Sequence, residues 1–393
     1  RALRRRVKRH VLAQTHDFVA VCSPGLEWAV TRELAELPVA PTIIERIKGG
    51  VHFRGRTDLM YTANLHLRTA SRVLMRVATF PAPTTEALFN RSKKVRWETF
   101  IGDNRGIRLS VTSRKSRVNH KRKIESIIED AVNSRLRELG LPTVTSSTKA
   151  ELRFHVRLDG DQCTLSFNTS GEHLHKRGWR RLATVAPIRE TLASYVLLAA
   201  RFETARLIVD PFCGSGTLCI EAAQAIAGIP SGLNRRFSFE LSPLFEPRKW
   251  EYYRRQAKEN IRSSIPGRIV GFDIDEKAIN IARLNAARGG VADFVDFYLA
   301  DALKVPLSKL AEGTERQLLV SNLPYGKRLS SPEFLGTFAK VIQNNCVGWH
   351  LAVLCVDPSP FESLPLESRS VQGLNNGGIR VKLLQGTVAN DSQ

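Results

Sequence analysis

Residues 207–217 read Leu-Ile-Val-Asp-Pro-Phe-Cys-Gly-Ser-Gly-Thr, and this stretch decides the fold class. The apolar run is typical of a buried strand, the Gly-Ser-Gly turn permits a tight bend, and an apolar helix is predicted over 218–227. A parallel α/β sheet uses this unit to present its carboxyl edge to a nucleotide-like ligand. The stretch therefore predicts an α/β, Rossmann-like domain with a binding site at residues 210–217.

Strand and helix signals continue to alternate on both sides of this stretch, over about residues 187–386. Further strands are predicted at 268–272, 294–299, 318–321, 350–355, near 371 and at 379–384. Such alternation predicts a doubly wound, mainly parallel sheet, and we assign this domain to residues 187–393. Residues 228–267 are interpreted as an insertion after the first helix that could form part of a substrate wall.

The residues before this domain predict two smaller α+β units. Residues 17–85 have strand signals from 17, at 51–53 and at 72–77, with helices at 26–37 and 58–67. Residues 86–170 have a strand at 107–112, a helix at 124–139 and a hairpin of 152–158 with 163–168. Residues 1–16 form a basic extension, interpreted as the end of a transit peptide, a phosphate-binding arm or a disordered tail. Residues 171–186 form a linker.

The charge of the chain is unusual, because 59 Lys and Arg stand against 38 Asp and Glu, a formal net charge of +21. Such a field favours a polyanionic partner through counterion release, although a basic surface kept for solubility is the alternative. We predict RNA as the partner. A basic segment before the helix at 124–139, together with the linker, provides the candidate contacts: Arg114, Lys115, Arg117, Lys121, Arg122, Lys123, Lys176 and Arg177. A solvated loop is the alternative interpretation of this segment.

Membrane and metal chemistry are not expected. No stretch approaches the ~18–20 apolar residues of a membrane helix. The six cysteines are scattered without the spacing of a zinc site, which favours a reducing compartment. Two histidines at the spacing of His173 and His175 are weak evidence for a metal site, so we predict no metal.

Polar residues follow four of the predicted strands, at the carboxyl ends where parallel sheets bind their ligands. Asp210, Asp273, Asp301 and Asn322 occupy these four strand ends. An acid at 273 can accept both hydroxyls of a ribose, and one at 301 can hold an adenine edge. Gly214-Ser-Gly216 lacks the third glycine of a dinucleotide fingerprint, and no Walker lysine is present. S-adenosylmethionine is therefore the predicted cofactor.

Residues 322–326, Asn-Leu-Pro-Tyr-Gly, are the most specific candidate site. The Asn322 amide oxygen can accept one N–H of a planar exocyclic amine, and the Leu323 carbonyl, turned outward by Pro324, can accept the other. Tyr325 offers a face for base stacking, and positioning supplies most of the rate without a strong base. A base within a folded RNA would be flipped out to reach this site. A turn that caps the strand is the alternative.

The chain resembles the THUMP-domain guanine-N2 methyltransferases, a branch of the class I S-adenosylmethionine-dependent enzymes. The resemblance covers about residues 17–385 and is carried by 49–53, 64–73, 174–179, 186–190, 210–217, 322–326 and 376–381. It implies a ferredoxin-like domain at 17–85, a THUMP RNA-binding domain at 86–170 and a C-terminal methyltransferase domain.

The resemblance also implies roles for single residues. Asp210, Gly214 and Gly216 would line the methionine end of the cofactor, Asp273 the ribose and Asp301 the adenine. The complete cofactor set is Asp210, Phe212, Gly214, Ser215, Gly216, Thr217, Asp273, Ile274, Asp301, Ala302 and Asn322, and the catalytic set is Asn322, Leu323, Pro324 and Tyr325. The chain departs from the family at Leu323, where proline is usual, and at Ser242-Pro243, where a tryptophan is often found.

We therefore predict an S-adenosylmethionine-dependent RNA methyltransferase that forms N2-methylguanosine in large-subunit ribosomal RNA, bound alone or within a pre-ribosomal particle. The linker residues 174–179 favour the ribosomal branch over the alternative of a tRNA methyltransferase. A further alternative is a catalytically weak ribosome assembly factor that keeps the fold. The predicted location is the cytoplasm, with the mitochondrial matrix as the alternative.

Overall fold

The computed structural model describes residues 2–102, 106–180, 187–324 and 331–390. These residues form two compact units, and each is described by itself. The first comprises residues 1–174 and 235–256, and the second comprises residues 175–234 and 257–393. No described helix is long and apolar enough to cross a membrane.

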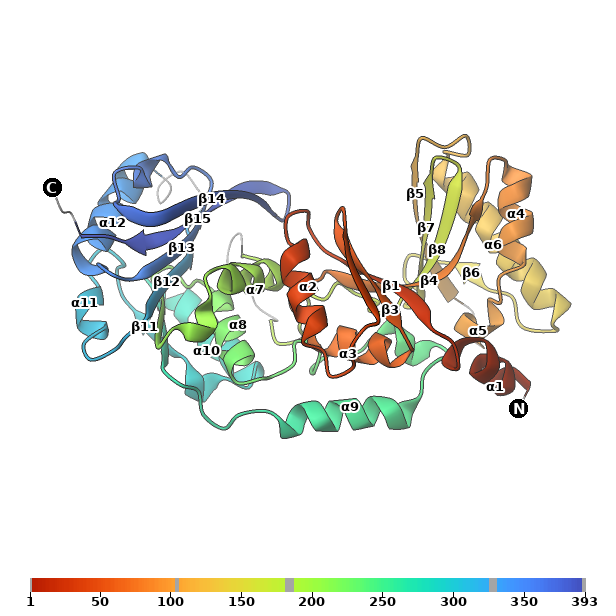
Figure 1. The fold of residues 1–393 in the computed structure, drawn as a ribbon, viewed down its shortest axis with the longest axis horizontal. Coiled ribbons are helices and arrows are strands. Elements are labelled where there is room, and N and C mark those ends of the chain that lie inside the picture. The colour runs from red at the N-terminus through yellow and green to blue at the C-terminus, as the bar shows by residue number, and fades with distance from the viewer. Residues whose placement is uncertain (1, 103–105, 181–186, 325–330, 391–393) are drawn as a thin grey trace. The chain divides into compact units, whose positions relative to one another are not determined.

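The first unit is built on a single eight-stranded sheet in the order β2-β3-β1-β4-β8-β7-β5-β6 (Figure 1). Its strands are β1 His16–Val21, β2 Ile43–Ile47, β3 Gly50–Gly55, β4 Arg72–Pro81, β5 Gly106–Arg114, β6 Thr145–Ser146, β7 Arg153–Asp159 and β8 Gln162–Asn168. Strand β4 pairs with β1 on one side and with β8 on the other. The two predicted α+β units therefore share one sheet, joined through β4.

Helices of the first unit bury their apolar faces on this sheet. They are α2 Glu27–Ala35, α3 Asp58–His66, α4 Thr85–Lys93, α5 Glu98–Ile101 and α6 Lys121–Glu138. In α6 the buried residues Ile124, Ile128, Val132 and Leu136 recur at helical spacing. This spacing is what predicted the helix from the sequence.

The N-terminal segment is helical. Helix α1 Ala2–Val7 continues into a short π-helical stretch, Lys8–Leu12. Val7 and Val11 are buried, and the His16 ring bonds to the Val11 carbonyl oxygen at 2.8 Å. The interpretation of these residues as a disordered tail is therefore not supported.

The segment from 235 to 256 belongs to the first unit, although the residues on both sides of it belong to the second. Helix α9 Pro247–Glu259 begins in it. The Tyr61 hydroxyl accepts a hydrogen bond from the Glu246 amide at 2.8 Å, and Tyr253 donates to Asp58 at 2.9 Å. Ser242 and Pro243 lie in this segment, so they are part of the first unit.

The second unit contains a seven-stranded sheet in the order β11-β10-β9-β12-β13-β15-β14. Its strands are β9 Leu207–Asp210, β10 Arg268–Asp273, β11 Asp296–Leu299, β12 Gln317–Asn322, β13 His350–Cys355, β14 Leu366–Asn376 and β15 Ile379–Val388. The first five are parallel, β15 runs antiparallel to β13, and β14 runs antiparallel to β15. This is the doubly wound arrangement predicted from the sequence.

Helices cover both faces of this sheet, with α7, α8 and α10 on one side and α11 and α12 on the other (Figure 1). Their bounds are α7 Glu190–Ala199, α8 Thr217–Ile226, α10 Glu276–Arg288, α11 Leu307–Leu310 and α12 Pro332–Asn345. The chain order reverses between β9 and β12, which are neighbours in the sheet. Ligands of such sheets bind at this point, beyond the carboxyl ends of the strands.

Candidate active site

A cavity of about 370 Å³ lies at the carboxyl ends of β9, β10, β11 and β12 in the second unit. Eleven of the residues predicted from the sequence line it: Asp210, Phe212, Gly214, Ser215, Thr217, Asp273, Ile274, Asp301, Ala302, Asn322 and Pro324. Gly216 and Leu323 are not among the lining residues, and Tyr325 lies outside the described residues. The structure thus brings together in one cavity residues that are up to 114 positions apart in the chain.

The glycine loop between β9 and α8 has a backbone that favours glycine. Gly214 and Gly216 have φ angles of 52° and 81°, in the left-handed region. A Cβ on Gly216 would lie 2.8 Å from Cζ of Phe297, so the position also lacks room for a side chain. Gly216 therefore shapes the loop, while Gly214 and Ser215 face the cavity.

Asp273, at the end of β10, holds this loop in place. Its Oδ2 accepts a hydrogen bond from the Gly214 amide at 2.9 Å, and its Oδ1 accepts one from Asp275 at 2.9 Å. Each carboxylate oxygen keeps unused acceptor capacity, because an ionised oxygen can accept more than one hydrogen bond. The carboxylate can therefore bind a ligand while it fixes the loop.

Asp210, at the end of β9, is 1% exposed and bonded to the neighbouring strand. Its Oδ1 accepts hydrogen bonds from the Ser321 hydroxyl at 2.7 Å and from the Phe212 amide at 3.2 Å. Burial raises the pKa of Asp210 to about 7; these two hydrogen bonds lower it, and the charge of Asp273 raises it. A cationic group in the cavity would favour the ionised form.

Asp301 and Ile274 lie on the side of the cavity formed after β11 and β10. The Asp301 Oδ1 atom accepts a hydrogen bond from the Leu303 amide at 3.0 Å, which fixes the turn after β11. Ile274 is 66% exposed and lines the cavity. An apolar ring bound there would cover it.

Residues 322–324 continue from β12 into the cavity wall. Asn322 and Pro324 line the cavity, whereas the Leu323 side chain is 1% exposed in the core of the sheet. The Leu323 amide donates a hydrogen bond to the Leu354 carbonyl at 2.9 Å. A proline at 323 would lose this bond, so the leucine at this position serves packing and strand pairing.

Eight further residues line the cavity that were not predicted from the sequence: Pro187, Ile188, Pro211, Cys213, Leu218, Asp275, Ala278 and Phe334. Phe334 comes from α12 and meets Phe212 edge to face at 5.9 Å between ring centres. Burial raises the pKa of the Cys213 thiol well above its usual range, so it is no thiolate nucleophile. The only sequence signal for Pro187 and Ile188 was the resemblance at 186–190.

The predicted RNA contacts fall into two classes. Lys121, Arg122 and Lys123 form the exposed first turn of α6, and the exposed residues Arg114, Lys115 and Arg117 precede it. Arg117 lies 3.4 Å from a carboxylate oxygen of Asp161. An exposed helix N-terminus with several cations is suited to bind a phosphate. The contact of these residues with RNA stays a prediction.

Arg177 is buried, so the prediction that it contacts RNA is wrong. Its side chain is 1% exposed, and its Nε lies 3.1 Å from Oε1 of Glu221 on α8. A buried guanidinium held by a buried carboxylate is inaccessible to RNA, so Arg177 is a structural residue of the second unit. Lys176, next to it, is exposed.

Arg180 connects two walls of the cavity. Its Nη2 donates to the Ile188 carbonyl at 2.8 Å and to the Thr217 hydroxyl at 2.6 Å. Ile188 and Thr217 both line the cavity. Arg180 therefore positions the start of α8 against the segment that precedes α7.

Three family models match the chain in sequence. They are the RlmL ferredoxin-like domain at residues 17–74, the THUMP domain at 82–168 and the RMKL-like methyltransferase domain at 177–367. Among curated proteins, the ribosomal RNA large subunit methyltransferase K/L of Syntrophotalea carbinolica is 30% identical over 95% of this chain. The protein of the same name from Aliivibrio fischeri is 29% identical over 92% of this chain. The chain spans about half the length of these relatives, 53% and 52%.

Solved structures agree over nearly the whole chain. SMU.472, described as a methyltransferase and complexed with SAH, has 28% identity and a TM-score of 0.83, covering 97% of this chain and 100% of its own. A possible methylase from Clostridium difficile 630 has 27% identity and a TM-score of 0.84 with the same coverage. A predicted N6-adenine-specific DNA methylase from Listeria monocytogenes has 28% identity and a TM-score of 0.81, covering 95% of this chain and 96% of its own.

The order of the matched domains agrees with the fold of both units and with the cavity at the carboxyl edge of the second sheet. By its RlmL ferredoxin-like, THUMP and RMKL-like methyltransferase domains, the chain belongs to the THUMP-containing methyltransferases.

Proposed function

We propose that the chain is an S-adenosylmethionine-dependent RNA methyltransferase that forms N2-methylguanosine in large-subunit ribosomal RNA. The observation that carries the proposal is the cavity that brings Asp210, Asp273 and Asp301 together with Asn322 and Pro324. The names of the curated relatives support ribosomal RNA as the substrate, and the THUMP domain match supports RNA binding. We propose the domain limits 17–85, 86–170 and 187–393, which are close to the matched ranges 17–74, 82–168 and 177–367, with residues 235–256 packed in the first unit.

The donor set of the cavity fits this cofactor. Asp273 would bind the ribose hydroxyls, Asp301 the adenine edge, and Asp210 with the loop at 214–216 the cationic methionine end. Ile274 and Phe212 offer apolar contact to the adenine. When bound, S-adenosylmethionine supplies an electrophilic methyl group on its sulfonium.

The residues 322–325 would hold the target amine. The Asn322 amide oxygen and the Leu323 carbonyl would accept its two N–H groups, which turns the nitrogen lone pair toward the methyl group. Positioning of this kind accelerates the reaction without a strong base, because the amine loses its proton after the C–N bond has formed. Tyr325 would clamp the ring by stacking.

The proposal is tested with purified protein, methyl-labelled S-adenosylmethionine and total ribosomal RNA from cells that lack the protein. We expect the cofactor to bind in calorimetry and the label to appear in N2-methylguanosine after digestion to nucleosides. Asn322→Ala should abolish transfer and leave RNA affinity unchanged, while the exposed Asn390→Ala, in the same unit, should keep both.

Other outcomes distinguish the alternatives. Label in N6-methyladenosine would favour the adenine chemistry named for the Listeria relative. A parallel reaction with tRNA from the same cells tests the other substrate, and label only in that reaction would favour tRNA over ribosomal RNA. RNA binding without cofactor binding would contradict the enzyme and support an assembly factor. The cytoplasmic location stays a prediction.

A further inference from the structure

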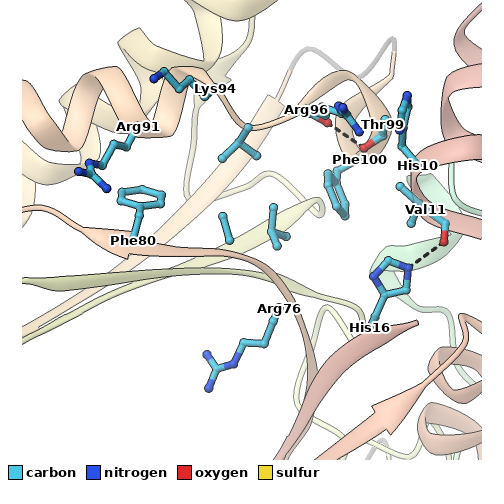
Figure 2. A pocket seen from close by; sticks show the side chains of 13 residues that line it. His10, Val11, His16, Arg76, Phe80, Arg91, Lys94, Arg96, Thr99 and Phe100 are labelled. Carbon is cyan, nitrogen blue, oxygen red and sulfur yellow. Dashed lines mark hydrogen bonds between the residues drawn. The ribbon is translucent and has the colours of Figure 1, made fainter. Parts of the chain in front are cut away.

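A second cavity lies in the first unit, apart from the candidate active site. Its volume is about 410 Å³, within the range of small-ligand pockets. Six basic side chains line it: His10, His16, Arg76, Arg91, Lys94 and Arg96. Figure 2 shows them spread around the cavity, with Arg91 and Lys94 on one side and Arg76 on the opposite side. No Asp or Glu is among the described residues that line it.

The positive charge of this cavity is not neutralised by its surroundings. Glu98, the carboxylate that acts on His10, is 1% exposed and already bound to Arg135 at 2.9 Å and near Arg6 at 3.7 Å. Arg91, Lys94 and Arg96 are exposed and have no carboxylate partner within the described part of the chain. Three such cations around one cavity would attract a phosphate.

The floor of the cavity is apolar and aromatic. Phe80 and Phe100 line it, together with Val11 of the N-terminal segment. The pairing of β4 with β8 shifts register between Arg76 and Ala78, and such a bulge redirects side chains. Arg76 and Ala78 both face the cavity. Aromatic rings under a cationic rim match the two parts of a nucleotide, the flat base and its phosphate.

A groove of about 960 Å³ lies along the N-terminal segment and is also basic. Its exposed cations without a carboxylate partner, counted over the residues that the structure describes, are Arg4, Arg5, Lys8, Arg56 and Arg248. The N-terminal segment, residues 2–12, therefore contributes to two basic hollows. Its residues Val7 and Val11 are buried, and Leu3 and Leu12 are half-buried.

We propose that the N-terminal segment forms part of a binding site for single-stranded RNA. The cavity accepts one unstacked nucleotide, and the groove holds phosphates of the adjoining strand. A duplex is too wide for a cavity of this size and keeps its bases stacked, whereas a single strand can turn one base inward. The site is separate from the basic residues 114–123. Residues 2–12 precede all three matched domains, whereas Arg91, Lys94 and Arg96 lie within the THUMP match. It rests on the proposal that RNA is the substrate.

The test measures binding of a fluorescent 12-nucleotide single-stranded RNA and of a duplex of the same length to the full chain. Replacing Arg91, Lys94 and Arg96 by Gln should weaken single-strand binding about tenfold. The slope of log affinity against log salt concentration should become smaller in magnitude by about 2. Each lost phosphate contact on a single strand lowers it by ~0.7, and three contacts are lost. Replacing Arg4, Arg5 and Lys8 by Gln should weaken it as well, and duplex binding should change less.

The matched control removes three exposed cations from helices of the second unit: Arg288, Lys309 and Lys340, each to Gln. It has the same net charge as each test variant and should bind almost as the parent does. A single-stranded RNA with one 4-thiouridine should crosslink to residues 76–100 or 2–16 of the parent. The variant with Arg91, Lys94 and Arg96 replaced by Gln should lose that crosslink.

Equal losses in the control and both test variants, or crosslinks only within residues 106–123, would overturn the proposal. The proposal would also be overturned if the test variants kept their RNA affinity but lost binding to an acidic peptide or to phosphatidylserine vesicles. Cofactor binding and methyl transfer are measured on the same samples. If methyl transfer fails but RNA binding still depends on Arg91, Lys94 and Arg96, only the proposed function is contradicted.

Discussion

Arg177 and Glu221 form a bidentate ion pair inside the second unit, with Nε to Oε1 at 3.1 Å and Nη2 to Oε2 at 3.3 Å. Ser194 donates to the same carboxylate at 2.6 Å. The pair connects the segment before α7, helix α7 itself and helix α8, which begins at the glycine loop. A buried charge pair therefore holds the middle of α8 in place.

Removing one partner of this pair should destabilise the protein strongly. Arg177→Ala leaves an unpaired carboxylate in the core, and we expect a loss of about 3–5 kcal/mol in the free energy of unfolding. Urea unfolding of the full chain measures it. The exposed neighbour offers the control, because Lys176→Ala should change the free energy by less than about 0.5 kcal/mol. Equal effects of the two variants would contradict the burial of Arg177.

Arg180 should affect the cofactor more than the fold. Arg180→Lys keeps the charge near Glu190 but cannot span the Ile188 carbonyl and the Thr217 hydroxyl as a guanidinium does. We expect S-adenosylmethionine affinity to fall about tenfold with kcat less affected, because both contacts shape the cavity wall. Calorimetry and a split of KM against kcat measure this. A loss of kcat with unchanged cofactor affinity would exclude a role of Arg180 in positioning the cavity wall.

The doubly wound sheet was predictable because its strands are short apolar runs between helical patterns. The order of strand ends then predicted Asp210, Asp273, Asp301 and Asn322, all of which line one cavity. Strand β2 Ile43–Ile47 was missed because it is an edge strand with exposed residues and lacks a clear alternation. Phe334 was missed because only the fold brings α12 to the cavity.

Long-range pairing set the limit of the prediction. Arg177 stands in a basic run, so the sequence placed it on the surface, and its partner Glu221 lies 44 residues further along in an apolar helix. The pairing of β4 with β8 is likewise invisible in the sequence, because both strands show only local alternation. Only the structure shows which basic side chains of these segments are buried and which are exposed.

Asp210 should make stability depend on pH. Burial raises its pKa from 3.8 to about 7, so the folded protein binds more protons than the unfolded chain between these values. Its contribution to stability is therefore largest below about pH 4 and is lost as pH rises to about 7. Asp210→Asn should raise the free energy of unfolding at pH 8 by roughly 2–4 kcal/mol without cofactor, and change it little at pH 4. Urea unfolding at both values measures it.

The same variant should lose cofactor affinity, because the amide lacks the charge that would face the cationic methionine end. For the parent, affinity should fall as pH drops below about 7, since Asp210 must then release a proton. Calorimetry in two buffers of different ionisation enthalpy detects that proton. Ser321→Ala serves as the control for a lost hydrogen bond with the carboxylate retained. Cofactor binding by Asp210→Asn with parental affinity would contradict the role of Asp210.

Gly216→Ala should disturb the loop for two reasons that a control separates. The φ of 81° is strained for alanine, and the added Cβ would lie 2.8 Å from Phe297. We expect a loss of about 2–4 kcal/mol in the free energy of unfolding together with loss of cofactor binding. Gly290→Ala has a similar φ of 71° with nothing within 4 Å, so it should cost only ~1 kcal/mol. Thermal unfolding with and without cofactor compares them, and equal shifts would exclude the steric cause.

The basic first turn of α6 should contribute to RNA affinity through charge alone. Lys121, Arg122 and Lys123 are exposed, and the helix N-terminus adds the positive end of its dipole. Replacing all three by Gln should weaken RNA binding about tenfold at physiological salt and reduce the salt slope by about 2, with cofactor affinity unchanged. Anisotropy titrations at several salt concentrations measure both quantities. The variant with Arg288, Lys309 and Lys340 replaced by Gln again provides a charge-matched control, and equal slopes for the two would exclude α6 from the RNA interface.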